Sequence, residues 1–590
     1  MDKSAEEQDM TGDQEYQAPE WAKHVIWYQI FPERFRNGDP TNDPTRERVG
    51  GPEGWHISPW TGDWYQQSEW EQSLGESFRD GVFKRRYGGD LQGIIDKLDY
   101  LQNLGIGALY LNPVFDAVSL HKYDTSYYHH VDRFFGPDPE GDVAIMEQED
   151  PNDPSTWQWT SADKLLLELI SEVHRRDMRI IIDGVFNHTG TDFWAFQDLE
   201  EKQEDSEYKD WYDVNSFRDT ENGTEFDYNG WWGVKSLPEL KEVDGTLVKP
   251  VREHIFSITR RWMDPDGDGD PSDGVDGWRL DVPEEIGQAF WKEWNTLVRD
   301  INPNAYTVGE IWTNKSREWI NGELFSAAMN YPFTEAIQNY MIDQAMSASD
   351  FFTNLRHLRN DLPGEAALVQ QNLMDSHDTP RLASMIVNPG RDFDTDTKPE
   401  EGFNVRKPNS EERLIQKLIA LFQFTYVGAP MIFYGTESGM WGADDPDDRK
   451  PMVWKEFKYE PEASHPLGGD RPVDDNYFDQ QLFDWYKKLA HIRNQHQALQ
   501  VGQFQELVVD NHKNTWAFAR VLNEQMFVIV AGNRSRESQT IEISLDDFDV
   551  SSDKHLEDLL TGSKVTVNGH QNIELELPAL SGAILSPEDN

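Results

Sequence analysis

The 590-residue sequence contains no cysteine. Disulfide bonds, thiol catalysis and thiolate-bound metals are therefore excluded. It also has no apolar run of the roughly 18 residues that a transmembrane helix requires. Residues 1–20 are polar and acidic, unlike a signal peptide, and we expect a disordered lead-in there. Secretion or a cell-envelope location after removal of an export signal is the favoured prediction, and a cytoplasmic location stays open.

Basic residues are scarce relative to acidic ones. Lys and Arg number 54 against 108 Asp and Glu, which gives a formal net charge of −54. Such a surface repels nucleic acids, anionic membranes and phosphorylated substrates, so a neutral ligand or polymer is the expected partner. The acidic residues are spread through every segment, which favours a halophilic protein that stays soluble in concentrated salt.

Aromatic residues, in contrast, are abundant, at 12% of the chain with 22 tryptophans. Aromatic rings stack on sugar faces, so this abundance hints at carbohydrate binding, although core packing accounts for most such residues in proteins. The length is too great for one hydrophobic core and predicts three or four structural units.

Apolar strand-like runs alternate with amphipathic helical patterns along most of the chain. Strands are predicted near residues 25, 107, 180, 276, 306, 325, 368 and 429, which is the count of a (β/α)8 TIM barrel. We assign the barrel to 21–188 and 251–499, with an inserted subdomain at 189–250 after the third strand. Short alternating segments from 500 to 590 predict a C-terminal all-β sandwich.

The segment GWRLDVPEE at 277–285 places Arg279 two residues before Asp281 at the end of a predicted strand. Side chains two apart on a strand share a face, so the guanidinium would hold the carboxylate ionised and aimed at the barrel mouth. That arrangement suits a carboxylate nucleophile. A purely structural ion pair is the alternative for these two residues alone.

Two further carboxylates, Glu310 and Asp378, follow predicted strand ends, and His188 and His377 accompany them. Three carboxylates at one barrel mouth repel each other, so at least one should have a raised pKa and donate a proton. Two carboxyl groups in different protonation states are what glycoside hydrolysis requires.

Two loops rich in Asp and Asn are candidate Ca²⁺ sites, because Ca²⁺ binds six to eight oxygen ligands. The first contains Asn37, Asp39, Asn42 and Asp43. The second alternates Asp with Pro and Gly, but it lacks a closing glutamate; its acidic residues are Asp264, Asp266, Asp268 and Asp270. Asp and Asn also form turns, so solvated turns are the alternative at both places.

Four segments in order resemble the conserved regions of the α-amylase family, glycoside hydrolase family 13. They are DGVFNHTG at 183–190, GWRLDVPEE at 277–285, GEIW at 309–312 and DSHDTPR at 375–381. GAPMIFYGTE at 428–437 and DPDDRKPM at 445–452 extend the resemblance, and the latter is similar to the neopullulanase, cyclomaltodextrinase and intermediate α-amylase branch. The resemblance spans about residues 25–500.

This resemblance implies a role for each matching residue. Asp281 would be the nucleophile, Glu310 the general acid and base, and Asp378 the carboxylate that stabilises the distorted sugar. The implied substrate-binding residues are His121, Tyr123, His188, Arg279, Trp312, His377 and Arg381. The implied Ca²⁺ site of the branch falls on Asn37, Asp39, Asn42, Asp43, Gly88 and Asp90.

The expected function is therefore a retaining, endo-acting hydrolase of α-1,4-glucosidic bonds in starch, with Ca²⁺ bound. Neopullulanase, cyclomaltodextrinase or transglycosylase activity is the alternative, and a non-catalytic amylase-like binding subunit is a remote one. The multi-strand N-terminal domain of dimeric members is not found before Trp21, so a monomer is expected. The segment SLPEL at 236–240 departs from the branch's specificity motif, which argues against narrow specificity.

Overall fold

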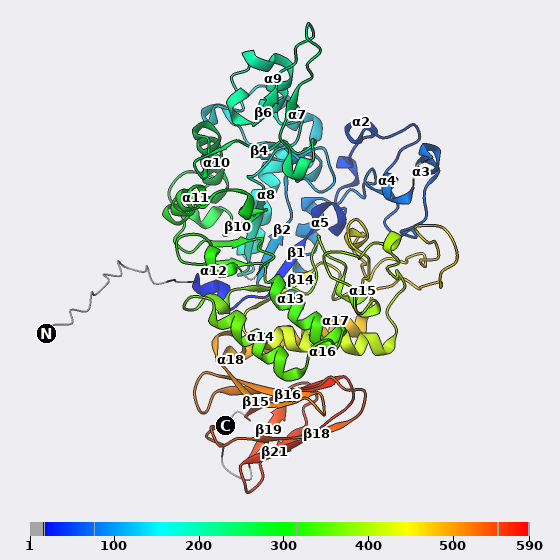
Figure 1. The fold of residues 1–590 in the computed structure, drawn as a ribbon, viewed down its shortest axis with the longest axis vertical. Coiled ribbons are helices and arrows are strands. Elements are labelled where there is room, and N and C mark those ends of the chain that lie inside the picture. Colours follow the sequence, from blue (N-terminus) through cyan, green and yellow to red (C-terminus); the bar gives the residue numbers. More distant parts are fainter. Residues whose placement is uncertain (1–15, 17, 76, 314, 551–553, 588–590) are drawn as a thin grey trace, which may run out of the picture.

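The computed structural model describes residues 16, 18–75, 77–313, 315–550 and 554–587. Its centre is a parallel eight-stranded sheet, of which β1, β2, β10 and β14 are labelled in Figure 1, and the strand order is β12-β11-β10-β5-β2-β1-β14-β13. A parallel bridge from Met329 to Gln371 joins the two end strands and closes the barrel. The strands are β1 (Trp27–Ile30), β2 (Ala108–Leu111), β5 (Arg179–Gly184), β10 (Gly277–Leu280), β11 (Tyr306–Gly309), β12 (Ala327–Ala328), β13 (Gln371–Asn372) and β14 (Ala429–Phe433). The predicted (β/α)8 barrel is confirmed.

Large side chains fill the barrel interior. Trp27, Tyr110, Ile181 and Tyr306 belong to one buried cluster, whereas the alternate residues of the same strands pack outward against the helices. Because strand side chains alternate with a period of two, Asp183 follows Ile181 on the inward side. Inward-facing residues that come later on each strand than this filled interior, such as Asp183, therefore lie at the barrel mouth formed by the carboxyl ends of the strands.

Helices surround the barrel, and side chains at several helix termini form hydrogen bonds with free backbone amides. At the start of the helix 410–425, the Asn409 side chain accepts from the Glu412 amide, and the Glu412 side chain accepts from the Asn409 amide. The helical segment 91–104 is divided at Lys97. The principal helices are α5 (Leu91–Asp96), α6 (Leu98–Leu104), α8 (Ser161–His174), α10 (Lys249–Met263), α11 (Gln288–Ile301), α13 (Tyr331–Ile337), α14 (Ala348–Asn360), α16 (Ser410–Thr425) and α17 (Gln480–Gln495).

Two loops project above the barrel mouth, where α9, β6, α7 and β4 appear in Figure 1. The predicted insertion after β5 contains α9 (Trp194–Lys202), β6 (Val214–Ser216), β7 (Asp227–Tyr228), β8 (Glu242–Val243) and β9 (Thr246–Leu247). The loop after β2 adds β3 (Phe115–Ala117), β4 (Thr125–Val131) and α7 (Pro139–Met146), which sequence patterns did not reveal. The Gly190 amide donates to the Thr125 carbonyl oxygen at 2.9 Å and so connects the two loops.

Short helices complete the barrel domain. The loop between β1 and α5 carries four of them, namely α1 (Pro32–Phe35), α2 (Arg46–Val49), α3 (Glu69–Leu74) and α4 (Phe78–Val82). Three more are α12 (Ser316–Trp319), α15 (Leu382–Val387) and α18 (Gln497–Val501).

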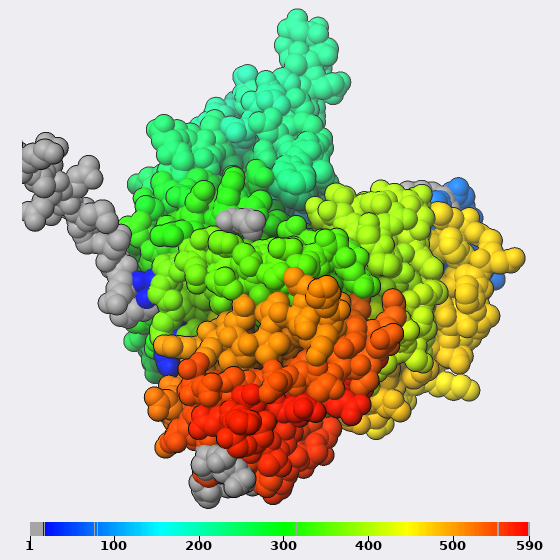
Figure 2. All heavy atoms as spheres, turned by 60° about the horizontal axis from the view of Figure 1, so that its bottom comes forward, coloured from blue at the N-terminus to red at the C-terminus, as the bar shows by residue number. Residues whose placement is uncertain are grey.

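The C-terminal residues form a β-sandwich. A six-stranded sheet in the order β15-β16-β17-β22-β19-β20 packs over the pair β18-β21, with one apolar cluster between them. Sequence alternation missed β15, β19 and β22. Figure 2 shows this domain, in orange and red, lying against the barrel, where Phe422 and Trp516 have ring centroids 5.2 Å apart. The strands are β15 (Gln503–Asp510), β16 (Thr515–Val521), β17 (Phe527–Asn533), β18 (Gln539–Ser544), β19 (His555–Asp558), β20 (Lys564–Thr566), β21 (Asn572–Leu577) and β22 (Ser581–Pro587).

The predicted lead-in at 1–20 needs one correction. Tyr16 is buried in the core, where its hydroxyl donates to the Ser326 carbonyl oxygen, and a short helical turn begins at Glu20. The aromatic ring of Tyr16 gives this end of the segment apolar area to bury, which its acidic neighbours lack. Residues 1–15 and 17 lie outside the described part of the chain.

Candidate active site

Neighbouring strand ends bring four charged side chains together. Asp183 ends β5, Arg279 and Asp281 lie on and after β10, and Glu310 follows β11. The parallel register pairs Arg279 with Asp183 across β10 and β5. Arg279 is fully buried, and Asp281 and Glu310 are 6% and 7% exposed. The structure thus brings these four groups together at the carboxyl ends of three neighbouring strands.

Arg279 contacts all three carboxylates. Its Nη1 donates to Asp183 Oδ1 at 2.9 Å and to Asp281 Oδ1 at 2.8 Å, and its Nη2 lies 2.8 Å from Glu310 Oε2. Burial raises the pKa of Asp281 well above its usual range; Arg279 opposes that rise, and Glu310 and Asp183 add to it. One guanidinium cannot neutralise three carboxylates, so the group retains a proton to higher pH than isolated carboxyls do.

The backbone directly after Asp281 is strained. Val282 has φ 36° and ψ 50°, in the left-handed region that β-branched residues rarely adopt. This turn directs the Val282 amide to Glu310 Oε2, to which it donates at 3.1 Å. The strained turn is therefore accompanied by a hydrogen bond from Val282, which follows the predicted nucleophile Asp281, to the predicted general acid Glu310.

Trp312 holds the other oxygen of Glu310. Its indole Nε1 donates to Glu310 Oε1 at 2.8 Å, and its ring stacks on Tyr331 with centroids 3.7 Å apart and planes 8° apart. The family resemblance implied that Trp312 binds substrate. In the structure one face of its ring is occupied by Tyr331, and its polar edge positions the acid.

Asp378 is more open, with its side chain 30% exposed. His377 Nε2 lies 3.1 Å from Asp378 Oδ2, and Arg449 Nη2 donates to Asp378 Oδ1 at 3.0 Å. Burial raises the pKa of Asp378 to about 7, with Arg449 opposing the rise and Glu310 adding to it. Sequence reasoning did not assign Arg449 a role, although it lies in the DPDDRKPM segment that carried part of the resemblance.

Tyr123 and His377 form one wall beside these acids. Their rings are nearly parallel, at 7°, with centroids 5.5 Å apart, and the Tyr123 hydroxyl donates to Asp183 Oδ2 at 3.0 Å. His121 Nδ1 accepts from the Tyr123 amide at 3.1 Å. Burial lowers the pKa of His377 well below its usual range and that of His121 to about 4, so both are neutral near pH 7.

His188 begins a row of rings that leads to the inserted loop. It is 2% exposed, its Nε2 has no hydrogen-bond partner among the described residues, and burial lowers its pKa to about 4. The His188 ring lies 5.6 Å from Trp231, and Trp231 stacks on Trp232 at 5.1 Å. Trp232 is 78% exposed and has φ 47°. Sequence reasoning missed this row; the signal was a Trp pair in a polar inserted loop.

The SLPEL segment packs along the same side. The Leu240 amide donates to the Asn187 carbonyl oxygen at 2.9 Å, and the Thr189 amide donates to the Pro238 carbonyl oxygen at 3.1 Å. The segment therefore borders His188.

Arg381 does not reach the mouth. It is fully buried, and its guanidinium donates to the carbonyl oxygens of Tyr434 at 2.7 Å and Asp448 at 2.8 Å. These bonds hold the backbone of the 434–448 loop, so the expected contact with substrate is corrected to a structural role.

The first Asp and Asn loop fits a Ca²⁺ ion. Asn37 Oδ1 and Asn42 Oδ1 are buried without a hydrogen-bond partner among the described residues. Gly88 has φ 73°, and a Cβ there would come 2.0 Å from Asp43 Oδ1. Burial raises the pKa of Asp43 to about 6, with nearby carboxylates adding to the rise, and a cation would offset that cost.

The remaining two predicted ligands also shape this loop. Asp90 accepts backbone amides of Gly38, Asp39 and Gly93 at 2.6–3.0 Å. Asp39 accepts from the Thr41 amide at 3.0 Å. Both carboxylates thus fix the backbone of this loop, and Asp90 also joins it to the start of α5.

The second acidic loop is arranged differently from the prediction. Asp264 and Asp266 gather with Asp273, not with Asp268 and Asp270. Asp268 accepts the Asp270 amide at 2.7 Å and Asp270 accepts the Ser272 amide at 3.1 Å, as turn-forming residues do. The four-aspartate set is thereby corrected: all four accept backbone amides within this loop, and only Asp264 and Asp266 lie beside a third carboxylate, that of Asp273.

Comparison with known proteins agrees with this geometry. The family described as alpha amylase, catalytic domain, matches residues 29–148 and 160–502. Neopullulanase 2 of Thermoactinomyces vulgaris is 34% identical, over 97% of this chain and 79% of its own. Cyclomaltodextrinase of Geobacillus thermopakistaniensis (strain MAS1) is 34% identical, over 93% and 74%. The ligand-free cyclic α-maltosyl-(1→6)-maltose hydrolase of Arthrobacter globiformis superposes with a TM-score of 0.68 at 27% identity, over 96% of this chain and 99% of that one. The chain belongs to the α-amylase family of glycoside hydrolases, glycoside hydrolase family 13.

Proposed function

We propose that this glycoside hydrolase is a retaining α-glucan hydrolase of the neopullulanase and cyclomaltodextrinase type. This replaces starch-specific endo-α-amylase as the leading hypothesis, because relatives with those names match most of the chain. The observation that carries the chemistry is the Arg279 guanidinium, which contacts both Asp281 and Glu310. One guanidinium bridging two carboxyls favours the close spacing of about 5–5.5 Å that retaining enzymes use.

In the proposed mechanism Asp281 attacks the anomeric carbon while Glu310 protonates the leaving glycosidic oxygen. Arg279 orients Asp281, and the Val282 amide and Trp312 indole hold Glu310 in place. The aglycone leaves, and Glu310 then removes a proton from water, which releases the sugar from Asp281. Asp378, His377 and His188 would bind hydroxyls of the distorted sugar.

Product stereochemistry and substrate preference test this proposal together. Proton NMR of early products from a cyclodextrin should show the α-anomer, whereas initial β-anomer would overturn retention. Rates on cyclodextrin and pullulan should equal or exceed the rate on starch; a strong preference for starch would restore the α-amylase hypothesis. Longer oligomers formed from maltotriose faster than glucose would identify a transglycosylase.

An active-site variant separates catalysis from binding. Asp281→Asn should melt no lower than the wild type, because burial raises the pKa of Asp281, but should lose at least about a hundredfold in kcat, because no nucleophile remains. A variant closer to wild-type activity would contradict the assignment. All three acids are present, which disfavours a non-catalytic binding subunit.

Ca²⁺ in the Asn37–Asp43 loop, a monomeric state, halophily and secretion remain predictions. Within the described residues no helix is long and apolar enough to cross a membrane.

A further inference from the structure

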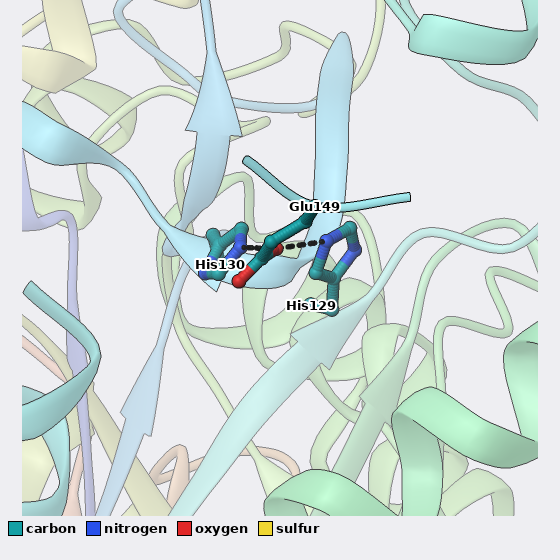
Figure 3. A group of neighbouring side chains, drawn as sticks. All are labelled: His129, His130 and Glu149. Carbon is teal, nitrogen blue, oxygen red and sulfur yellow. Dashed lines mark hydrogen bonds and ion pairs between the residues drawn. The ribbon is translucent and has the colours of Figure 1, made fainter. Parts of the chain in front are cut away.

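Three side chains that commonly bind metals meet away from the acids of the active site. They are His129 and His130 on β4 and Glu149 in the loop after α7, and their ligand atoms lie within 4.8 Å of one another. Figure 3 shows the Glu149 carboxylate between the two imidazole rings. The three side chains are 0%, 0% and 1% exposed. The cluster is therefore closed to substrate.

An irregularity in β4 brings two consecutive histidines to the same side. Consecutive strand residues normally face opposite ways. Phe115 of β3 pairs with Val131 of β4, but the next residue, Asp116, pairs with Tyr127. Three residues of β4 thus bulge out of the register, and the ring centroids of His129 and His130 lie 4.3 Å apart.

The distances suit a tetrahedral ion. Glu149 Oε2 lies 2.8 Å from His130 Nε2 and 3.5 Å from His129 Nε2. Zinc bonds of about 2.0–2.1 Å place neighbouring tetrahedral ligand atoms roughly 3.3 Å apart. Small side-chain movements would therefore admit the ion, and three protein ligands leave a fourth position.

A second carboxylate orients His130. Asp163 Oδ2 lies 2.8 Å from His130 Nδ1, which leaves Nε2 directed at Glu149. Asp163 itself accepts from the Val131 amide at 2.8 Å and from the Thr160 amide at 3.0 Å. A carboxylate on the far nitrogen of a ligating histidine is a recurrent feature of metal sites.

His129 provides the decisive observation. It is fully buried and makes no hydrogen bond to the described residues: its Nδ1 has no partner, and its Nε2 has only the 3.5 Å ion-pair contact with Glu149 Oε2. Its ring stacks on Trp157 at 4.3 Å and 11°, which fixes the plane of the imidazole. The short contacts of His130 with Glu149 and Asp163 account for His130, whereas a buried imidazole that makes no hydrogen bond, as His129 does, is costly and needs another explanation.

We propose that His129, His130 and Glu149 bind a structural Zn²⁺ ion. Glu149 and Trp157 lie within 149–159, the segment that the α-amylase family match omits. The ion would tie this segment to β4 and to the barrel beneath it. The proposal does not depend on the substrate assigned above.

Metal content and thermal stability of the full chain test the proposal, with Ca²⁺ in excess throughout. After removal of bound metal with a zinc-selective chelator, added Zn²⁺ should bind at about one ion per chain and raise the melting temperature. Co²⁺ in its place should give the visible absorption of a tetrahedral site. Absence of binding, or binding without a change in melting temperature, would overturn the proposal.

Two variants separate the metal site from the ion pair. His129→Phe keeps an aromatic ring against Trp157 and removes only the 3.5 Å contact with Glu149, so the metal-free variant should melt near the metal-free wild type. The affinity of this variant for Zn²⁺ should fall at least about a hundredfold, and added Zn²⁺ should no longer raise its melting temperature. His174→Gln is the control, because His174 lies outside the cluster and pairs with Asp276. This variant should retain the wild-type affinity for Zn²⁺ and the Zn²⁺-dependent rise in melting temperature. Zn²⁺ binding by His129→Phe with wild-type affinity would refute the proposal.

Discussion

At the residue scale, the active site depends on a single guanidinium placed among three carboxylates. Arg279 could be positioned from the sequence relative to Asp281, but its contacts with Asp183 and Glu310 require the neighbouring strands β5 and β11. The consequence is that Arg279 is not replaceable by Lys, because an ammonium group cannot reach several carboxylates with the same fixed geometry.

The Trp312 hydrogen bond leads to the first prediction. Trp312→Phe preserves an aromatic ring beside Tyr331 but removes the donor to Glu310 Oε1. A hydrogen bond to a charged group is worth about 1.5–3 kcal/mol, so kcat/KM should fall about 10- to 150-fold. Steady-state kinetics on a maltooligosaccharide measure the loss.

Tyr331→Phe is the matched control. It keeps the stacked ring and loses only a hydroxyl that lies 3.3 Å from Ser376 Oγ. Its kcat/KM should stay within about threefold of wild type. Equal losses in both variants would show that the stack, not the indole N–H, supports Glu310.

Asp378 connects catalysis with stability. Its pKa is about 7 in the folded protein and 3.8 without the protein environment. A carboxyl whose pKa is raised on folding destabilises the folded state when it is ionised. The resulting loss of stability grows from about pH 4 to pH 7 and stays constant at higher pH. Asp378→Asn should therefore raise the melting temperature more at pH 8 than at pH 5 while it lowers kcat.

Calorimetry at the two pH values measures this difference. A lower melting temperature for the variant at pH 8 would mean that the ion pair with Arg449 outweighs the cost of burial.

At the element scale, loops rather than strands carry most of the features that distinguish this chain. The Asn37–Asp43 loop predicts Ca²⁺-dependent stability, because an ion that binds only the folded state shifts the unfolding equilibrium. Chelation of Ca²⁺ should lower the melting temperature, and Asp43→Asn should weaken Ca²⁺ binding at least about tenfold. Asp268→Asn changes a turn-forming aspartate and serves as control. An unchanged melting temperature with no calcium by elemental analysis would refute the site.

The exposed end of the His188, Trp231 and Trp232 row belongs to the inserted loop. Its position predicts a platform for sugar units beyond the cleaved bond, because aromatic faces stack on sugars. Trp232→Ala should raise KM for pullulan severalfold and leave kcat/KM for a short maltooligosaccharide nearly unchanged. Met526→Ala, an exposed apolar residue on the C-terminal sandwich, should change neither. Equal effects on long and short substrates would contradict the platform.

At the scale of the whole molecule, the net charge of −54 sets the response to salt. Repulsion among surface carboxylates destabilises the compact state at low ionic strength, and molar salt, with a Debye length of about 3 Å, removes most of this cost. The melting temperature should rise between about 0.05 M and 2 M NaCl. KM for a neutral glucan should change only modestly, since the substrate is not steered by charge.

A flat or falling melting temperature over that range would mean that the acidic surface serves solubility alone. Thermal unfolding at several NaCl concentrations, with KM measured alongside, distinguishes the two outcomes.

The sequence by itself determined the barrel, the family and the order of the principal acids. Strand and helix periodicities are local properties, and period-two alternation already placed Arg279 and Asp281 on one face. The capping box of α16 was readable for the same reason, because its two residues are three apart.

Only the tertiary structure decided which distant groups meet. Arg449 reaches Asp378 from 71 residues away, and Arg381, close to Asp378 in sequence, turns instead into the protein interior. The bulge in β4 reverses the facing of one histidine, which alternation alone predicts wrongly. Long-range contacts depend on how loops pack over a finished barrel, and no local pattern encodes that packing.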